Sequence, residues 1–100
     1  MIEGKTTIEP NTTSEILIED VRGYKKIQLK LMEEGTMWGT AFLFGGFDKK
    51  FTDHSFKTQN IFRDALNVFD VEPGYHFLKL KVRNASYLLP MVVTWTLDLQ

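Results

Sequence analysis

The residues of this chain that could do catalytic or metal chemistry are few and follow no recognised pattern. His54 and His76 are the only histidines, and they do not form the closely spaced pair that holds a metal on a helix. There is no cysteine, which excludes thiolate ligands, a cysteine nucleophile and disulfide bonds. No serine lies in a nucleophile-elbow motif, and Gly45-Gly46 lacks the Lys-Ser/Thr of a phosphate-binding loop. The sequence therefore predicts a protein that is not an enzyme and has no cofactor.

Three aspartates lie in or near a central polar region and are the residues best suited to bind a cation. They are Asp48, Asp53 and Asp64. Carboxylate oxygens are the ligands that calcium prefers, but the spacing of an EF-hand loop is missing and basic residues flank two of the three. We therefore expect no metal site.

Aromatic residues offer a second kind of chemistry, because a flat apolar face can stack on a sugar ring. Six aromatic residues lie at strand ends or in loops, namely Tyr24, Trp38, Phe47, Phe51, Tyr75 and Tyr87. Of these, Tyr24, Trp38 and Tyr75 are the candidate glycan-stacking residues. The alternative is that these rings only pack in the core and at its rim, as aromatic residues do in many small β domains.

The segment Tyr87-Leu88-Leu89-Pro90-Met91 is apolar although it connects two strands and is therefore expected at the surface. It either folds over the open end of the core or contacts another chain. A net charge of −1 gives little repulsion between copies. We therefore predict a homo-oligomer or a tight partner complex. The candidate contact residues are Met37, Leu43, Tyr87, Leu88, Leu89 and Met91.

Composition bounds the class of protein. One hundred residues predict a single domain spanning 1–100. The 12 basic and 13 acidic residues give no clustered basic segment, so no nucleic-acid partner is expected. No apolar run approaches the length of a membrane span, and the segment MIEGKTTIEP lacks the apolar core of a signal peptide.

The elements that must position these residues are strands, because the dominant hydrophobic period is two. It is clearest in residues 24–32, 76–83 and 92–99. In residues 38–44 both faces are partly apolar, and we expect Phe42 to lie in the core. The residues predicted to be almost fully buried are Leu29, Phe42, Leu80, Trp95 and Leu97.

The remaining elements are less clearly patterned. Ser14–Glu19 and Thr6–Glu9 predict two short strands. Lys57–Val71 is either a helical turn capped by Asn60 or two short strands. Turn residues separate the runs at short intervals. Together these features predict an all-β protein, a two-sheet antiparallel β-sandwich of jelly-roll-like form with seven or eight strands.

The order of several motifs resembles the small β-sandwich domains of bacteriophage virion proteins. The resemblance begins with Gly23-Tyr24 before IQLKL and continues with the stretch from Gly35 to Asp48, in which Gly-Thr, Trp-Gly-Thr and alternating apolar residues precede a turn. It ends with Pro73-Gly74-Tyr75 before LKLKVR and with the final VVTWTL. The chain departs from the pattern at Met37, which separates Gly-Thr from Trp, and at Asp48-Lys49, where Asp-Gly is usual.

The resemblance implies a structural or adhesion-type domain of a tail, baseplate, fibre or capsid decoration. Such a protein would be made in a bacterial host's cytoplasm and would act in the virion, through contacts with other virion subunits. The alternative function is a carbohydrate-binding module that holds a glycan, for example on the host surface, by aromatic stacking. No catalytic residues accompany the resemblance.

Overall fold

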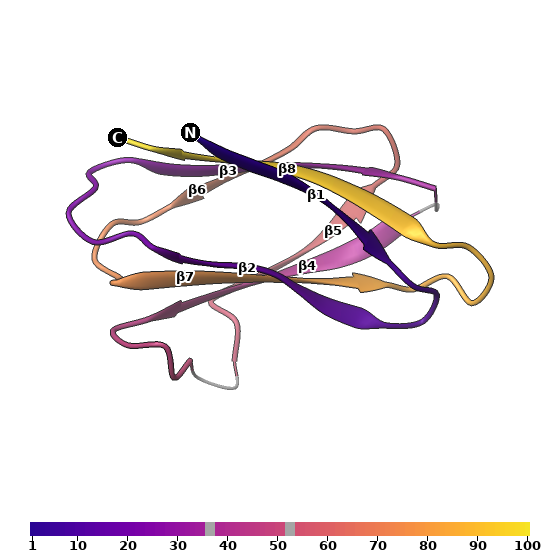
Figure 1. Ribbon diagram of the computed structural model, residues 1–100, viewed down its shortest axis with the longest axis horizontal. Coiled ribbons are helices and arrows are strands. Elements are labelled where there is room, and N and C mark those ends of the chain that lie inside the picture. Colours follow the sequence, from indigo (N-terminus) through magenta and orange to yellow (C-terminus); the bar gives the residue numbers. More distant parts are fainter. Residues whose placement is uncertain (36–37, 52–53) are drawn as a thin grey trace.

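The computed structural model describes residues 1–35, 38–51 and 54–100, and their regular structure consists of eight β-strands. The strands are β1 (Ile2–Ile8), β2 (Thr13–Asp20), β3 (Ile27–Glu34), β4 (Trp38–Gly46), β5 (Lys57–Phe62), β6 (Asn67–Val71), β7 (Phe77–Asn84) and β8 (Met91–Leu99). They form two four-stranded antiparallel sheets that lie face to face, with orders β1-β8-β3-β6 and β2-β7-β4-β5 (Figure 1).

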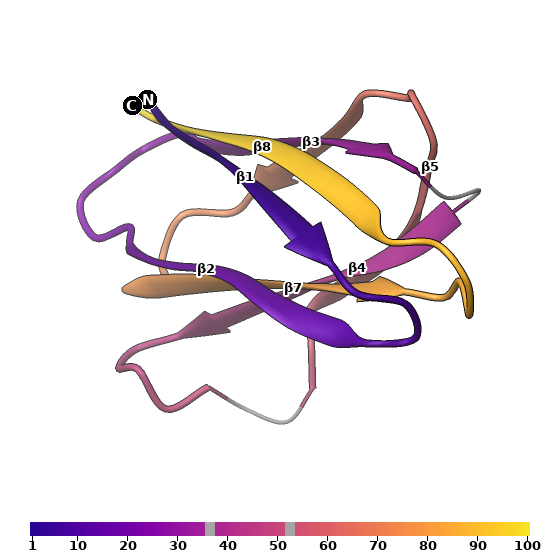
Figure 2. The ribbon, with the colours of Figure 1, turned by 45° about the vertical axis from the view of Figure 1, so that its right-hand side comes forward.

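The strand order is that of a jelly roll. Apart from the β4–β5 hairpin, every connection passes from one sheet to the other, so strands consecutive in the chain alternate between the layers. The two ends of the chain meet at one corner, where β1 lies beside β8 (Figures 1 and 2). The predicted two-sheet β-sandwich is therefore confirmed.

The core lies between the sheets and is built from the inward side of each alternating strand. Ile27, Leu29 and Leu31 of β3 are almost completely buried. The inward residues of β7 and β8 are buried with them, namely Leu78, Leu80, Val82, Val93, Trp95 and Leu97. Period-two alternation located these faces correctly, because each of these strands has one polar and one apolar side.

The orientation of β4 differs from the sequence prediction. Ala41 and Leu43 are each 1% exposed and face the core, while Phe42 is half-buried on the outer side of the sheet. Both sides of β4 are apolar, so its own sequence does not decide which faces inward. The neighbouring strand does, because cross-strand partners share a face and Ala41 is paired with the buried Val82 of β7.

The segment from Lys57 to Val71 forms two strands, β5 and β6, and the helical alternative is wrong. Asn60 does not cap a helix but lies in β5, where its Oδ1 accepts a hydrogen bond from Thr40 Oγ1 at 3.3 Å. The chain crosses between the sheets after Phe62, through Asp64 with a φ of 59°. The apolar residues 61, 62, 65, 66 and 69 have helical spacing only when the segment is treated as one element. In the structure they are divided between β5, β6 and the connection between them, and each strand buries alternate residues.

Candidate functional site

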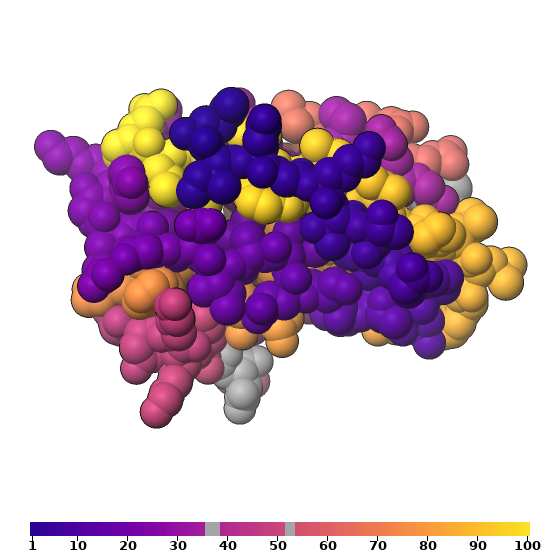
Figure 3. All heavy atoms as spheres, in the orientation of Figure 1, coloured from indigo at the N-terminus to yellow at the C-terminus, as the bar shows by residue number. Residues whose placement is uncertain are grey.

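A pocket lies at the end of the sandwich where β4 leaves its sheet. The described parts of the β4–β5 connection, residues 47–51 and 54–56, project below the body of the molecule (Figures 1 and 3). Together with the turn before β7 they border an open pocket of about 370 Å³. This volume falls within the range of small-molecule sites. The residues around it are Gly45, Gly46, Phe47, Asp48, Lys50, His54, Phe56 and Tyr75.

Three aromatic rings line this pocket. The Phe56 and Tyr75 rings are stacked, with centroids 5.3 Å apart and planes inclined by 18°. The Phe47 ring lies 6.2 Å from that of Tyr75 and is 70% exposed. Gly45 makes room for this arrangement, because a Cβ there would lie 2.5 Å from the Tyr75 ring. The close approach of the Tyr75 ring therefore requires a glycine at position 45.

Backbone hydrogen bonds join the segments that carry the rings to β4. The Phe56 N–H donates to Leu43 O at 2.9 Å, and the His76 N–H donates to Gly46 O at 3.0 Å. The His76 ring also meets the Phe47 ring edge-on, with centroids 5.4 Å apart. These hydrogen bonds fix the backbone that carries the rings before any ligand arrives, which lowers the entropic cost of binding.

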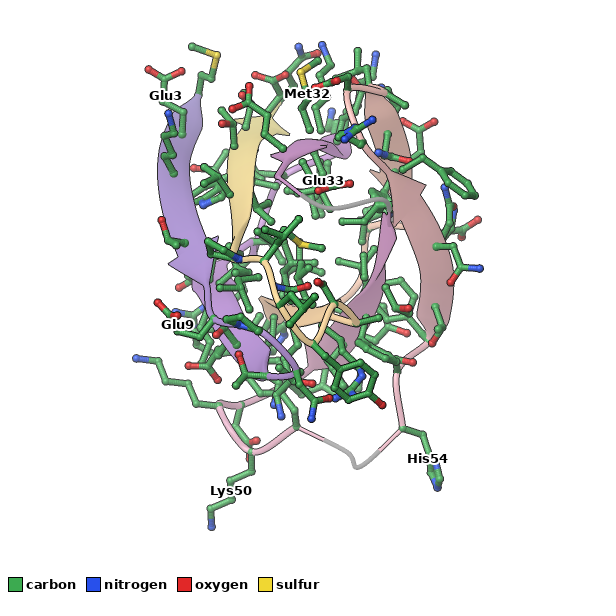
Figure 4. All side chains as sticks on the ribbon, turned by 90° about the vertical axis from the view of Figure 1, so that its right-hand side faces the viewer. Glu3, Glu9, Met32, Glu33, Lys50 and His54 are labelled. Carbon is green, nitrogen blue, oxygen red and sulfur yellow. The ribbon has the colours of Figure 1, made fainter. Side chains whose placement is uncertain are left out.

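Polar groups border the mouth of the pocket. One oxygen of Asp48 accepts a hydrogen bond from the Lys50 N–H at 2.8 Å, which shapes the turn. In Figure 4 the side chains of Lys50 and His54 extend from the loop away from the sandwich. The site therefore combines apolar ring faces with hydrogen-bonding groups at its edge, the combination expected for a small polar ligand.

Of the two predicted glycan-stacking residues whose side chains the structure describes, Tyr75 lines this pocket and Tyr24 does not. Tyr24 is 40% exposed in the β2–β3 connection and does not line the pocket. The side chain of Trp38 lies outside what the structure describes. Phe47 and Phe56 were not among the predicted stacking residues. Phe47 could have been predicted, because an aromatic residue directly after Gly45-Gly46 is expected at the end of a strand.

The second candidate surface is the β7–β8 loop, at the opposite end of the sandwich (Figure 1). Tyr87, Leu88 and Leu89 are 78%, 86% and 54% exposed, so this part of the segment does not close over the core. We call these three residues the apolar loop. The lid alternative is therefore wrong for them.

Two of the predicted contact residues are not at the surface. Met91 is fully buried, because it begins β8 on the inward side opposite Ile8, and its terminal methyl lies against Gly39. Leu43 is buried on the inward side of β4. Both side chains belong to the core, so the prediction that they contact another chain is wrong. Met37 lies outside the described residues.

The apolar loop is held by hydrogen bonds from two polar side chains. The fully buried Asn84 donates through Nδ2 to Ile8 O at 3.1 Å and to Leu89 O at 2.8 Å. Ser86 Oγ accepts from the N–H groups of Leu88 and Leu89 at 3.2 and 3.1 Å. The exposed apolar side chains are thus presented on a defined backbone rather than on an irregular tail.

Charged groups elsewhere form local pairs. Arg22 makes three side-chain hydrogen bonds to Asp20, and these, together with its backbone N–H, lower the pKa of Asp20 to about 2. In residues 1–35, 38–51 and 54–100, no three histidine, aspartate or glutamate side chains come together as a metal site. In the same residues, no helix is long and apolar enough to cross a membrane.

Comparison with known proteins supports the fold. No protein-family model matches the chain, and no curated protein is significantly similar to it. Among solved structures, the crystal structure of PirA superposes with a TM-score of 0.67 over 94% of this chain and 93% of that chain, at 13% sequence identity. The likeness at this identity establishes a shared β-sandwich fold.

Proposed function

We propose that this domain is a non-catalytic carbohydrate-binding module whose ligand enters the pocket of Phe47, Phe56 and Tyr75. The observation that carries the proposal is the grouping of three aromatic rings around a cavity edged by Asp48. A sugar ring has an apolar C–H face and a rim of hydroxyl groups. The face packs on the exposed Phe47 ring, and the hydroxyls donate to Asp48 at the edge of the pocket.

The pocket favours this function over the one first expected from the sequence, because it is a concave site whereas the side chains of the apolar loop are exposed and lie outside it. The proposal needs no reacting group. Binding comes from excluding water from the ring faces and from hydrogen bonds made at the rim.

The test is a Phe47→Ala variant screened with the parent on a glycan array, followed by titration calorimetry with the best ligand. We expect affinity to fall at least about tenfold, which corresponds to about 1.4 kcal/mol. Phe62→Ala is the matched control, because Phe62 is a 54% exposed phenylalanine that does not line the pocket. Equal binding by the parent and the Phe47 variant, or no glycan binding by the parent, would contradict the proposal.

A second candidate function is favoured by the apolar loop. Under it, the domain is a structural subunit of a virion, in keeping with the resemblance of its motifs, and the loop contacts a second copy of the chain. Three neighbouring exposed apolar side chains on a held backbone suit such a contact, because little conformational entropy is lost when they are buried. The two functions are compatible if the particle attaches to a host glycan.

Sedimentation of the purified protein tests this second function. We expect the parent to associate at micromolar concentration and a Leu88→Asp/Leu89→Asp variant to be monomeric. Burying one leucine side chain contributes about 1.5–3 kcal/mol, so placing two charges there should abolish the contact. Phe62→Asp supplies a control with a charge at another exposed apolar residue. A monomeric parent would exclude the homo-oligomer.

A further inference from the structure

One strand places three cationic side chains in a row on the outer face of the β2-β7-β4-β5 sheet. They are Lys79, Lys81 and Arg83 of β7, which we call the β7 strip. Their chain neighbours Leu78, Leu80 and Val82 are fully buried on the inward side, so the strip faces outward. Alternate residues of a strand lie about 6.6–6.8 Å apart, which gives a regular line of positive charge.

Within the described residues, no member of the strip forms an ion pair, and Arg83 Nη2 donates a hydrogen bond to Asn11 Oδ1 at 2.8 Å. The ion pairs there join Arg22 to Asp20, Lys30 to Asp98 and Arg63 to Asp64, and none includes a residue of the strip. The one acidic residue directly opposite it on β2 is Glu15, which is paired in register with Lys81 but lies beyond ion-pair distance.

The opposite sheet has the reverse charge. The outward residues of β1, β3, β6 and β8 include four carboxylates and two lysines, namely Glu3, Glu34, Asp70, Asp98, Lys5 and Lys30. Over their outward strand residues, that face carries four carboxylates against two lysines, a net charge of −2, and the face of the strip carries three cations against Glu15 and Asp20, a net charge of +1. This separation could not be seen from the total charge.

Phenyl rings hold the lysines of the strip in place. Lys79 Nζ lies 4.7 Å from the ring centroid of Phe44 and 4.6 Å from that of Phe51, and Lys81 Nζ lies 5.7 Å from that of Phe44. A cation over a ring is oriented without losing its charge. The ammonium groups are therefore positioned in advance to meet anions from the solvent side.

We propose that the β7 strip binds a linear acidic polysaccharide through its carboxylate or sulfate groups. Charge complementarity identifies the ligand as a polyanion, and the covered Phe44 ring beneath the lysines favours a glycan over a nucleic acid. Single-stranded nucleic acid binds such faces by stacking its bases on open aromatic rings. Phe44 is only 8% exposed, and the lysines lie over its face, so it is not open to a base. Binding of a polyanion at the β7 strip does not require the pocket, so the two proposals are tested separately.

The experiment measures the affinity of the folded protein for heparin fragments and for polygalacturonate, with dextran and oligothymidylate as comparison ligands, at low and at physiological salt. Under the proposal, both acidic polysaccharides bind, dextran does not, and binding weakens with salt. Lys79→Gln/Lys81→Gln/Arg83→Gln should weaken binding roughly tenfold or more.

The matched control is Lys5→Gln/Lys25→Gln/Lys26→Gln, which removes the same charge from exposed lysines outside the strip and should retain affinity. Lys79→Arg/Lys81→Arg keeps the charges and should also bind, which shows that the positive charge rather than the lysine side chain itself is needed. Equal loss in the two glutamine variants, stronger binding of oligothymidylate, or no binding of either acidic polysaccharide would each overturn the proposal. The Phe47→Ala variant should bind the acidic polysaccharides like the parent, which separates this test from that of the pocket.

Discussion

A Trp95→Ala variant should lose about 3–5 kcal/mol of its free energy of unfolding, the cost typical of removing a large buried aromatic side chain. Trp95 is only 9% exposed and lies in β8, which pairs with β1 on one side and β3 on the other. Its indole covers Gly4, where a Cβ would lie 2.6 Å from the ring. Among the described residues no acceptor meets its Nε1, so its contribution is packing rather than hydrogen bonding.

Denaturant unfolding followed by far-ultraviolet circular dichroism measures this loss. For a domain of this size the melting temperature should fall by more than about 10 °C. Trp95→Phe keeps a ring in the same space and should cost less. Gly4→Ala should also destabilise the fold, because the added methyl has to displace the indole. A Trp95→Ala variant that melts with the parent would refute the assigned packing of β8.

An Asn84→Ala variant should be the next most damaging change, with a loss of about 2–5 kcal/mol. Its side chain donates to Ile8 O and Leu89 O and accepts from the Ser86 N–H, joining the end of β1 to the β7–β8 loop. Truncation leaves two carbonyls without that donor, and a buried group left unsatisfied costs about 1–3 kcal/mol. The apolar loop should also lose its defined shape.

Two measurements check the Asn84 prediction. Chemical unfolding gives the loss of stability, and limited proteolysis should show faster cleavage within residues 85–90. Asn60→Ala is the control, because Asn60 is exposed on β5 and its loss should change stability by less than about 0.5 kcal/mol. An Asn84→Ala variant with parental stability and the same cleavage rate would show that the loop is ordered by other contacts.

Only part of the candidate pocket could be predicted from the sequence. Tyr75 could be selected because an aromatic residue after Pro-Gly lies at a turn. Its partners Phe47 and Phe56 belong to a different connection, and they reach Tyr75 only because β4 and β7 pair side by side. That pairing is a long-range contact, which no local pattern contains.

The sequence by itself determined the class of fold and the inward faces of β3, β7 and β8. These strands alternate polar and apolar residues, and burying one apolar side against another sheet is the only arrangement that satisfies the pattern. It did not determine the orientation of β4, the burial of Met91 or the structure of residues 57–71. Each of these depends on which strand lies alongside, so the tertiary structure decided them through cross-strand register and contacts between the sheets.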